Sequence, residues 1–395
     1  MNAWRDQYAI VGIGLTGTVG DHPQWSARLM QSEAARLAIE DAGLKPQDID
    51  GAINARGEGG GGGSGTWTDA FPRVLGLPVN VYFHIGRGSA AGTLGLIMAT
   101  KLLDLGIAKY VVVAYGDDLR TKSHRKGGGI RGVGGRPGLW GPPFGDVTAA
   151  SHHSFYASKH MNEYGTTHHQ LGSVTVSIRQ WGAMNPNAHF YRRPITLEDY
   201  DNSPWVVWPY HLLDICLVRE GGSAYVVTTA ERAKDCRKQP IYTMGVGTGE
   251  HMAKLWWEHR ALMEMPIKPA KETAFRMAGI ELEDIDIAQL YDCFTTEVLL
   301  QLEDFGWCKK GEGGPFVEEG NIAPGGKLPV QTGGGLHGSH HHGDLTGMLE
   351  SVIQLRGEAG ERQVKDAEIA MFVGGGGEIL QPGMCQLRTC TILRR

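Results

Sequence analysis

Residues 38–50 read Ala38-Ile-Glu-Asp-Ala-Gly-Leu-Lys-Pro-Gln-Asp-Ile-Asp50, and this stretch returns later as Ala274-Phe-Arg-Met-Ala-Gly-Ile-Glu-Leu-Glu-Asp-Ile-Asp286. The two copies share both alanines, the glycine and the closing Asp-Ile-Asp. Each copy predicts a helix end, a glycine stop, a turn bounded by aspartate and a strand. Each is followed by a Gly-rich turn, a second helix and an apolar strand. Repeated strand–helix units of this kind predict an α/β fold of two similar halves that face each other, with a site between them.

The segments around the two copies supply the other expected elements. The chain opens with an apolar strand over 8–14, and a helix over 32–42 follows, with Ser32 as its N-cap and Gly43 as its stop. The remaining expected elements are a helix over 89–105, a strand over 110–114, a turn at 343–347, a helix over 348–355 and a strand over 368–373.

Length and composition fit this organisation. We expect the 395 residues to form an N-terminal half over 1–240, with a loop or insert region at about 120–215, and a C-terminal half over 241–395. The net charge of -5 excludes a general nucleic-acid binder, because such domains carry a strong basic excess. No apolar run predicts a membrane span, and the first residues lack the pattern of a signal peptide. Six cysteines without a Cys-x-x-Cys pair favour reduced thiols in a cytoplasmic protein.

Several motifs occur in an order that is typical of one family. They are the strand at 9–14, the turn His84-Ile-Gly-Arg-Gly-Ser-Ala-Ala-Gly92, the segment Pro209-Tyr-His-Leu-Leu-Asp-Ile-Cys216 with Glu220-Gly-Gly-Ser-Ala224, the block Tyr291-Asp-Cys-Phe294, and the glycine groups at 334–347 and 374–377. Over nearly the whole chain this order resembles the thiolase superfamily, in its branch of lipid-transfer and sterol-carrier proteins. The resemblance implies the thiolase fold, five layers (α-β-α-β-α) built from two duplicated halves, usually as a dimer that takes an acyl-CoA ligand.

Two departures from the thiolase pattern bear on the chemistry. Thiolases carry a nucleophilic cysteine just before the first Gly-x-Gly turn, at a helix N-terminus that lowers the thiol pKa. Here that position falls on Ile85, and the position of their second, acid–base cysteine falls on Phe372. Cys293 and Cys308 are interpreted as buried apolar thiols. Catalysis through an acyl-enzyme is therefore not expected.

Two polar residues remain at positions that act on the thioester in the related branch. Tyr291 stands where sterol-carrier thiolases have the histidine of a His-Asp-Cys-Phe motif, and His341 stands where they have a substrate-activating histidine. Together with the missing nucleophile, this tyrosine resembles the steroid side-chain aldolases, which cleave a β-hydroxyacyl-CoA by a retro-aldol step. That step needs a base and an acid but no covalent nucleophile. Tyr291 and His341 can each fill either role, and Tyr291 can also be a core tyrosine whose hydroxyl is satisfied.

Glycine amides and nearby side chains complete the predicted site. The amides of Gly86, Gly88, Gly374 and Gly375 are candidates for an oxyanion hole. Possible lining residues are His84, Ile85, Asp292, Cys293 and Phe372, and capping of the following helix is the default role of Asp292. Arg87 and Arg131 are candidates for a CoA phosphate, with solvated arginines as the alternative. No metal site is expected, because the consecutive histidines at 340–342, even with His337, have poor geometry for ligation.

The preferred interpretation is a carbon–carbon lyase that splits a β-hydroxyacyl-CoA into a ketone or aldehyde and a shortened acyl-CoA. It has no bound cofactor and takes a CoA thioester as substrate. The resemblance also implies a homodimer and a small partner with an OB-fold and a zinc ribbon. Two alternatives stay open, an acyltransferase with a relocated nucleophile such as Cys293, and a non-catalytic subunit that binds acyl-CoA or lipid. The aromatic residues of the middle segment, from Trp181 to Tyr210, are compatible with a steroid or aromatic acyl group, or with ordinary packing.

Overall fold

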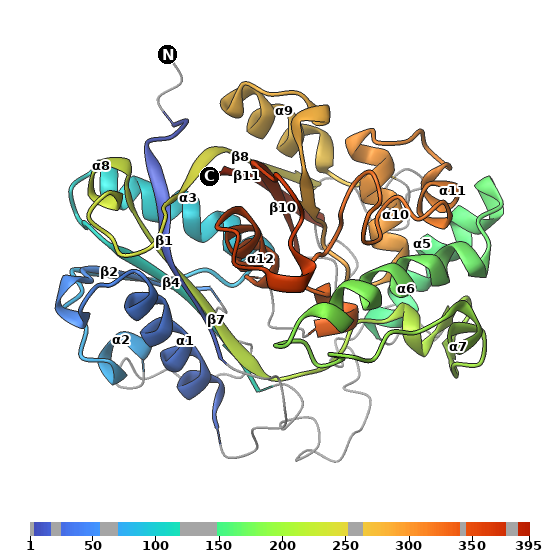
Figure 1. Cartoon of the computed structure of the whole chain (residues 1–395), viewed down its shortest axis with the longest axis horizontal. Helices are drawn as coiled ribbons and strands as arrows, with labels where there is room; N and C mark the ends of the chain where they lie inside the picture. The colour runs from blue at the N-terminus through green and yellow to red at the C-terminus, as the bar shows by residue number, and fades with distance from the viewer. Residues whose placement is uncertain are drawn as a thin grey trace, which may run out of the picture.

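The computed structural model describes residues 4–16, 25–55, 70–118, 148–251, 264–339, 345–376 and 386–395 (Figure 1). Within these residues, nine strands form one sheet in the order β3-β2-β4-β7-β1-β8-β11-β10-β9. The first half supplies β1 (Tyr8–Leu15), β2 (Gly51–Asn54), β3 (Val81–His84), β4 (Val111–Asp117) and β7 (Gly221–Thr229), and the second half supplies β8 (Ile241–His251), β9 (Ile287–Gln289), β10 (Ile369–Gly376) and β11 (Gln386–Arg394). The halves join where β1 pairs antiparallel with β8.

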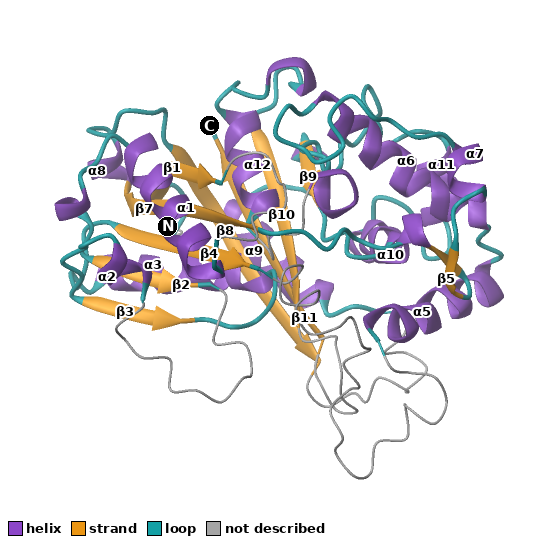
Figure 2. Ribbon diagram, turned by 90° about the horizontal axis from the view of Figure 1, so that it is seen from below, coloured by secondary structure: helices purple, strands orange, loops and turns teal. Residues whose placement is uncertain are grey.

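Helices cover the outer faces of the strands and fill the space between the two halves. On the outside, α1 (Ala27–Asp41) packs against the first half and α9 (Ile267–Ala278) against the second. Between the halves lie α3 (Ala90–Asp104) and α12 (Thr346–Leu355), whose apolar side chains share one buried cluster with strands of both halves. Figure 2 shows helices on either face of the strands. The expected α-β-α-β-α layering of two similar halves is thus confirmed.

The last aspartate of the repeated stretch has the same structural role in both halves. Asp50 accepts hydrogen bonds from the two backbone amides just before β4, at 2.7 and 3.0 Å. Asp286 does the same for the two amides at the start of β10, at 2.8 and 2.9 Å. Because each carboxylate fixes where the next parallel strand begins, the motif recurs wherever a helix feeds into such a strand pair.

Glycines in the first strand of each half let its helix approach closely. A Cβ atom on Gly12 of β1 would lie 2.1 Å from the carbonyl oxygen of Ala38 in α1. A Cβ on Gly247 of β8 would lie 1.9 Å from the carbonyl oxygen of Ala270 in α9. Any side chain at these positions would push the helix off the sheet, so the Gly-x-Gly pattern of the opening strand reflects packing.

The expected helix over 32–42 begins a turn and a half earlier than the sequence indicated. Its N-cap is Ser26, whose hydroxyl accepts the Leu29 amide at 3.3 Å, and Ser32 is buried inside the helix. The N-cap prediction was wrong because the first turn exposes Arg28 and Leu29 to solvent and so shows no apolar periodicity. The expected strands at 8–14, 110–114 and 368–373 and the helices at 89–105 and 348–355 correspond to β1, β4, β10, α3 and α12.

A group of helices lies beside the sheet, on the right in Figures 1 and 2. It combines helices of the expected insert region with two from the second half. The members are α5 (Ala149–Tyr164), α6 (His168–Met184), α7 (Leu197–Asp201), the hairpin of β5 (Trp205–Val207) and β6 (Tyr210–His211), α10 (Thr295–Phe305) and α11 (Gly313–Glu318). The short helices α2 (Phe71–Val74) and α8 (Ala230–Ala233) complete the described α-helices. None of the described helices is both long and apolar enough to cross a membrane.

Candidate active site

Tyr291 lies between the end of β9 and the start of α10, and its backbone is fixed on both sides by one side chain. Gln301 accepts the Tyr291 amide at 3.0 Å and donates to the Tyr291 carbonyl at 2.6 Å. The half-buried Tyr291 ring lies directly against the end of β10, because a Cβ on Gly375 would be 2.5 Å from its Cδ1. The structure therefore brings together Tyr291 and Gly375, two of the residues predicted from sequence.

Ser89 joins the start of α3 to the same end of β10. Its buried Oγ donates to the Gly375 carbonyl at 3.0 Å and accepts the Gly375 amide at 2.8 Å. A Cβ on Gly374 would lie 2.5 Å from the Ser89 carbonyl oxygen, so the two backbones are in close contact. The Gly375 amide, predicted as an oxyanion donor, is thus already bonded to a hydroxyl.

The first glycine turn differs from the expectation in one respect. Ile85 does not stand at a helix N-terminus, because its amide bonds to the Asn54 carbonyl at 2.8 Å and so continues β3. The residue that precedes α3 is Ser89. Gly86 and Gly88 lie in the turn between them, and Gly88 has a positive φ of 56°. The Gly-x-Gly motif did not single out Ser89, because the helix begins after the glycine turn and not within it.

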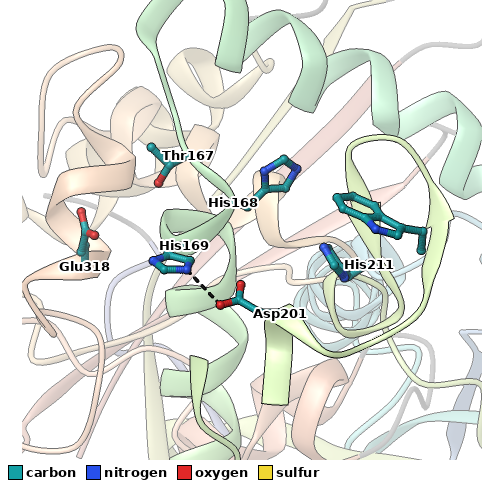
Figure 3. Close-up of a pocket in the computed structure, with 7 residues that line it drawn as sticks. Thr167, His168, His169, Asp201, His211 and Glu318 are labelled. Carbon is teal, nitrogen blue, oxygen red and sulfur yellow. Dashed lines mark hydrogen bonds and ion pairs between the residues drawn. The ribbon is translucent and has the colours of Figure 1, made fainter. Parts of the chain in front are cut away.

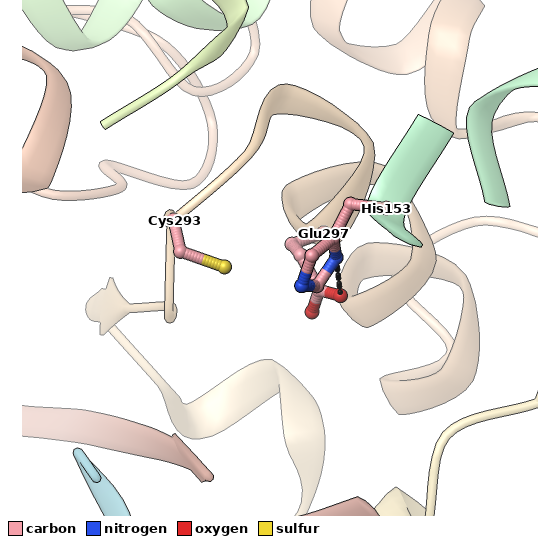
Figure 4. Close-up of side chains that lie close together, drawn as sticks. All are labelled: His153, Cys293 and Glu297. Carbon is pink, nitrogen blue, oxygen red and sulfur yellow. Dashed lines mark ion pairs between the residues drawn. The ribbon is translucent and has the colours of Figure 1, made fainter. Parts of the chain in front are cut away.

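A buried polar cluster lies close to Tyr291, whose ring centre is 5.9 Å from the Arg388 guanidinium carbon. Figure 4 shows three of its members, His153, Cys293 and Glu297. Glu297 on α10 bonds to Arg388 on β11 at 2.5 Å and to His153 on α5 at 3.1 Å, and all three side chains are excluded from water. Burial raises the pKa of Glu297, but Arg388 and His153 outweigh it and hold that pKa below its usual value. Burial lowers the pKa of His153. The cluster is therefore an ionised Arg–Glu pair beside a neutral imidazole.

The same cluster includes Cys293, whose thiol is a candidate metal ligand or acyl-accepting nucleophile. Ligand atoms of Cys293, His153 and Glu297 lie within 4.8 Å of one another. The charge of Glu297 is already balanced by Arg388, and burial raises the pKa of the Cys293 thiol well above its usual range. A thiolate is needed both for metal ligation and for nucleophilic attack. The donor set therefore suits an internal hydrogen-bond network better than a divalent cation.

Asp292 does not cap the helix that follows it. The residue preceding α10 is Phe294, which makes no side-chain cap, so this default expectation was wrong. The fully buried Asp292 carboxylate instead accepts the Leu336 amide and the Gln331 side-chain amide, both at 2.8 Å. These partners lie some forty residues later in the chain, beyond the reach of a local capping rule.

The other predicted lining and phosphate-binding residues occupy mixed environments. Arg87 forms an ion pair with Glu250 of β8, so its charge is already matched. His84 is exposed on β3 and contacts Asn54 at 3.3 Å. Phe372 is a buried residue of β10, and its ring packs against the start of α12. His341, Arg131 and the histidines at 340–342 lie outside the described residues.

A separate cavity of about 560 Å³ lies in the helical group (Figure 3). Its wall consists of Thr167, His168, His169, Asp201, Trp205, His211 and Glu318. His169 pairs with Asp201 at 3.0 Å. The Trp205 ring stacks on Trp208, and both side chains are more than half exposed. Sequence reasoning treated these tryptophans mainly as packing residues, whereas the structure presents them at the surface.

Comparison with known proteins adds an independent finding. A family model described as thiolase C-terminal domain-like matches residues 249–388. The chain is 35% identical to the steroid side-chain-cleaving aldolase of Thermomonospora curvata, over 93% of this chain and 95% of that protein. It is 34% identical to the 17-hydroxy-3-oxo-4-pregnene-20-carboxyl-CoA lyase of Mycobacterium tuberculosis, over 94% and 97% of the two chains. The solved structure called Ltp2-ChsH2(DUF35) aldolase superposes with a TM-score of 0.84 at 30% identity, over 99% of this chain and 98% of that one.

Proposed function

Because this chain belongs to the thiolase superfamily, among relatives that are acyl-CoA lyases and side-chain-cleaving aldolases, we propose that it cleaves a β-hydroxyacyl-CoA by a retro-aldol reaction. The observation that carries the proposal is the group formed by Tyr291, Gly375 and Ser89. It combines a phenol and a hydroxyl at the meeting point of the two halves, beside the start of α3.

The reaction needs two proton transfers and one bond cleavage. A base removes the proton of the β-hydroxyl group, the Cα–Cβ bond breaks, and a ketone or aldehyde leaves. The electron pair moves into the thioester as an enolate, and an acid then protonates Cα. We assign these two transfers to Tyr291 and His341, in either order, since both residue types serve as general acids or bases. No covalent nucleophile is consumed.

The enolate oxygen needs hydrogen-bond donors while its charge develops. We place it at the turn before α3, where the amides of Gly86 and Gly88 are the candidate donors. The N-terminus of α3 favours negative charge at this point. The alternative of an acyltransferase that uses Cys293 has less support, because that thiol is buried and its pKa is raised.

A second copy and a partner protein belong to the proposal as well. The outer strand β3 is the edge of the described sheet, with Phe83 38% exposed, and an open edge of this kind can pair with another chain. We therefore propose a homodimer. The name of the structural relative joins two components, which supports a partner subunit here. From the family resemblance we propose that this partner is a small protein with an OB-fold and a zinc ribbon. The described cysteines are free thiols, which suits a cytoplasmic location.

The proposal is tested by incubating the purified chain with β-hydroxyacyl-CoA and β-ketoacyl-CoA thioesters, with and without the partner, followed by mass spectrometry. One probe is 17-hydroxy-3-oxo-4-pregnene-20-carboxyl-CoA, the compound in the name of the Mycobacterium tuberculosis relative. We expect a ketone or aldehyde and a shortened acyl-CoA from the hydroxy compounds. Cleavage of keto compounds alone, with free CoA, would support an acyltransferase instead. Binding without turnover would support a non-catalytic subunit.

A further inference from the structure

The turn formed by residues 331–339 is bonded at two points to one buried carboxyl group, that of Asp292. Oδ2 of Asp292 accepts the Leu336 amide and Oδ1 accepts the Gln331 side-chain amide, both at 2.8 Å. Asp292 is fully excluded from solvent, so water cannot replace either bond. The two oxygens of the carboxyl group accept these bonds separately, so one side chain can hold two partners. This one side chain therefore anchors the turn at Gln331 and at Leu336.

The backbone of the turn takes a shape that requires such an anchor. Gly334 and Gly335 have positive φ values of 95° and 50°, and Gln331, which is not a glycine, has a φ of 52°. A left-handed non-glycine residue is costly unless its surroundings hold it in place. A Cβ on Gly335 would lie 2.2 Å from Oδ2 of Asp292, so the carboxylate occupies the space that a side chain would need.

The same contacts tie the turn to Tyr291. The Gln331 side chain that bonds to Asp292 also donates to the carbonyl of Leu290, on the other side of Tyr291. Gln301 of α10 fixes the Tyr291 backbone itself. The residues that flank Tyr291 and the turn thus form one hydrogen-bonded unit.

We propose that Asp292 is a positioning residue, whose carboxylate fixes the turn at 331–339 against the Tyr291 segment and so holds Tyr291 in place at the end of β10. It exchanges no proton with substrate and acts only through the turn. Its catalytic consequence rests on the proposed function, whereas its structural consequence does not. Other groups that support the turn are Thr332, bonded to Gln289 at 2.9 Å, and His337, bonded to the Leu213 carbonyl at 3.2 Å.

The test compares Asp292→Ala and Asp292→Asn with a matched control, Asp304→Asn. Asp304 lies at the other end of α10 and accepts the Met265 amide at 2.8 Å, and burial raises its pKa as it does that of Asp292. Hydrogen exchange of the peptide 331–339 and the kinetic constants of the retro-aldol reaction are measured on all variants. For Asp292→Ala we expect about tenfold faster exchange in this peptide. We also expect kcat to fall about 100-fold, with KM changed less than about threefold.

Asp292→Asn keeps one acceptor oxygen for the Leu336 amide, so it should recover part of both losses. Gly335→Ala disrupts the same contact from the side of the turn. The changes in exchange and kcat in the double variant with Asp292→Ala should be smaller than the sum of those in the two single variants. The control variant should change neither exchange at 331–339 nor kcat.

Three results would overturn the proposal. One is unchanged exchange in Asp292→Ala, and another is faster exchange with unchanged kcat. The third is equal effects in the control. If the wild-type chain turns over no substrate, the proposed function fails, while the exchange data still decide whether Asp292 holds the turn.

Discussion

The hydroxyl of Ser89 bonds to both the amide and the carbonyl of Gly375, at 2.8 and 3.0 Å, and thereby links the central helix of the first half to the second half of the molecule. The contact joins residues that are far apart in sequence, and it lies beside the Tyr291 ring. The interface between the two similar halves is thus also the place where the proposed chemistry occurs.

Replacing Ser89 with alanine should destabilise the protein. The buried Gly375 amide would lose its acceptor, and an unsatisfied buried donor costs about 1–3 kcal/mol. Ser351→Ala is a suitable control, because the buried Ser351 hydroxyl only donates back to the Gly347 carbonyl at 2.9 Å within its own helix. Urea unfolding of both variants measures the difference. Equal stability of the two would show that the Ser89 contact contributes nothing beyond an ordinary buried serine.

Removing the Tyr291 hydroxyl should reduce turnover without unfolding the protein. In Tyr291→Phe we expect kcat to fall about 10²–10⁴-fold, the range that general acid–base groups contribute. Tyr225→Phe serves as the control, since the Tyr225 hydroxyl is buried and donates to the Gly92 carbonyl at 2.6 Å. That variant should lose stability and keep its activity. Full activity in Tyr291→Phe would leave Tyr291 as a packing residue.

Local sequence rules predicted the fold because both halves are built from short-range signals. The glycine stops, the apolar strands and the repeated Asp-Ile-Asp each act over a few residues, and Asp50 and Asp286 do the same work in the structure. Tyr291 and Gly375 were predicted through the resemblance, and they meet in the structure.

The contacts that shape the candidate site were missed because they join distant residues. Asp292 stands where a helix cap is expected locally, yet its carboxyl group accepts a hydrogen bond from the Leu336 amide, 44 residues later. The pair of Glu297 and Arg388 spans 91 positions, and no spacing rule relates them. Ser89 was missed for a different reason: the glycine turn before α3 is longer than the motif suggests, so the helix begins at Ala90, five residues after Ile85.

Stability should decline in mild acid because of His337. Burial lowers the pKa of this imidazole to about 4, from an ordinary value of 6.5. As the pH falls from 6.5 towards 4, the unfolded chain binds a proton at His337 while the native protein does not. Unfolding is therefore favoured by up to roughly 3 kcal/mol. In His337→Gln this part of the pH dependence should vanish. Urea unfolding midpoints between pH 4.5 and 7.5 measure this pH dependence. The control is His169→Gln, since the His169 side chain is exposed.

The aromatic residues of the hairpin should divide into two classes. Trp205 and Trp208 are 52% and 64% exposed, so Trp205→Ser and Trp208→Ser should each change the free energy of unfolding by less than about 0.5 kcal/mol. Tyr210, in the adjacent strand, is fully buried and its hydroxyl bonds to the His153 carbonyl and to Thr296, at 3.1 and 2.9 Å. Tyr210→Phe should therefore cost about 1–3 kcal/mol, although it removes a single atom. Guanidinium unfolding of the three variants compares them directly. A large loss of unfolding free energy in either tryptophan variant would mean that the stacked pair stabilises the fold. Its exposed surface would then be explained without a ligand or a partner.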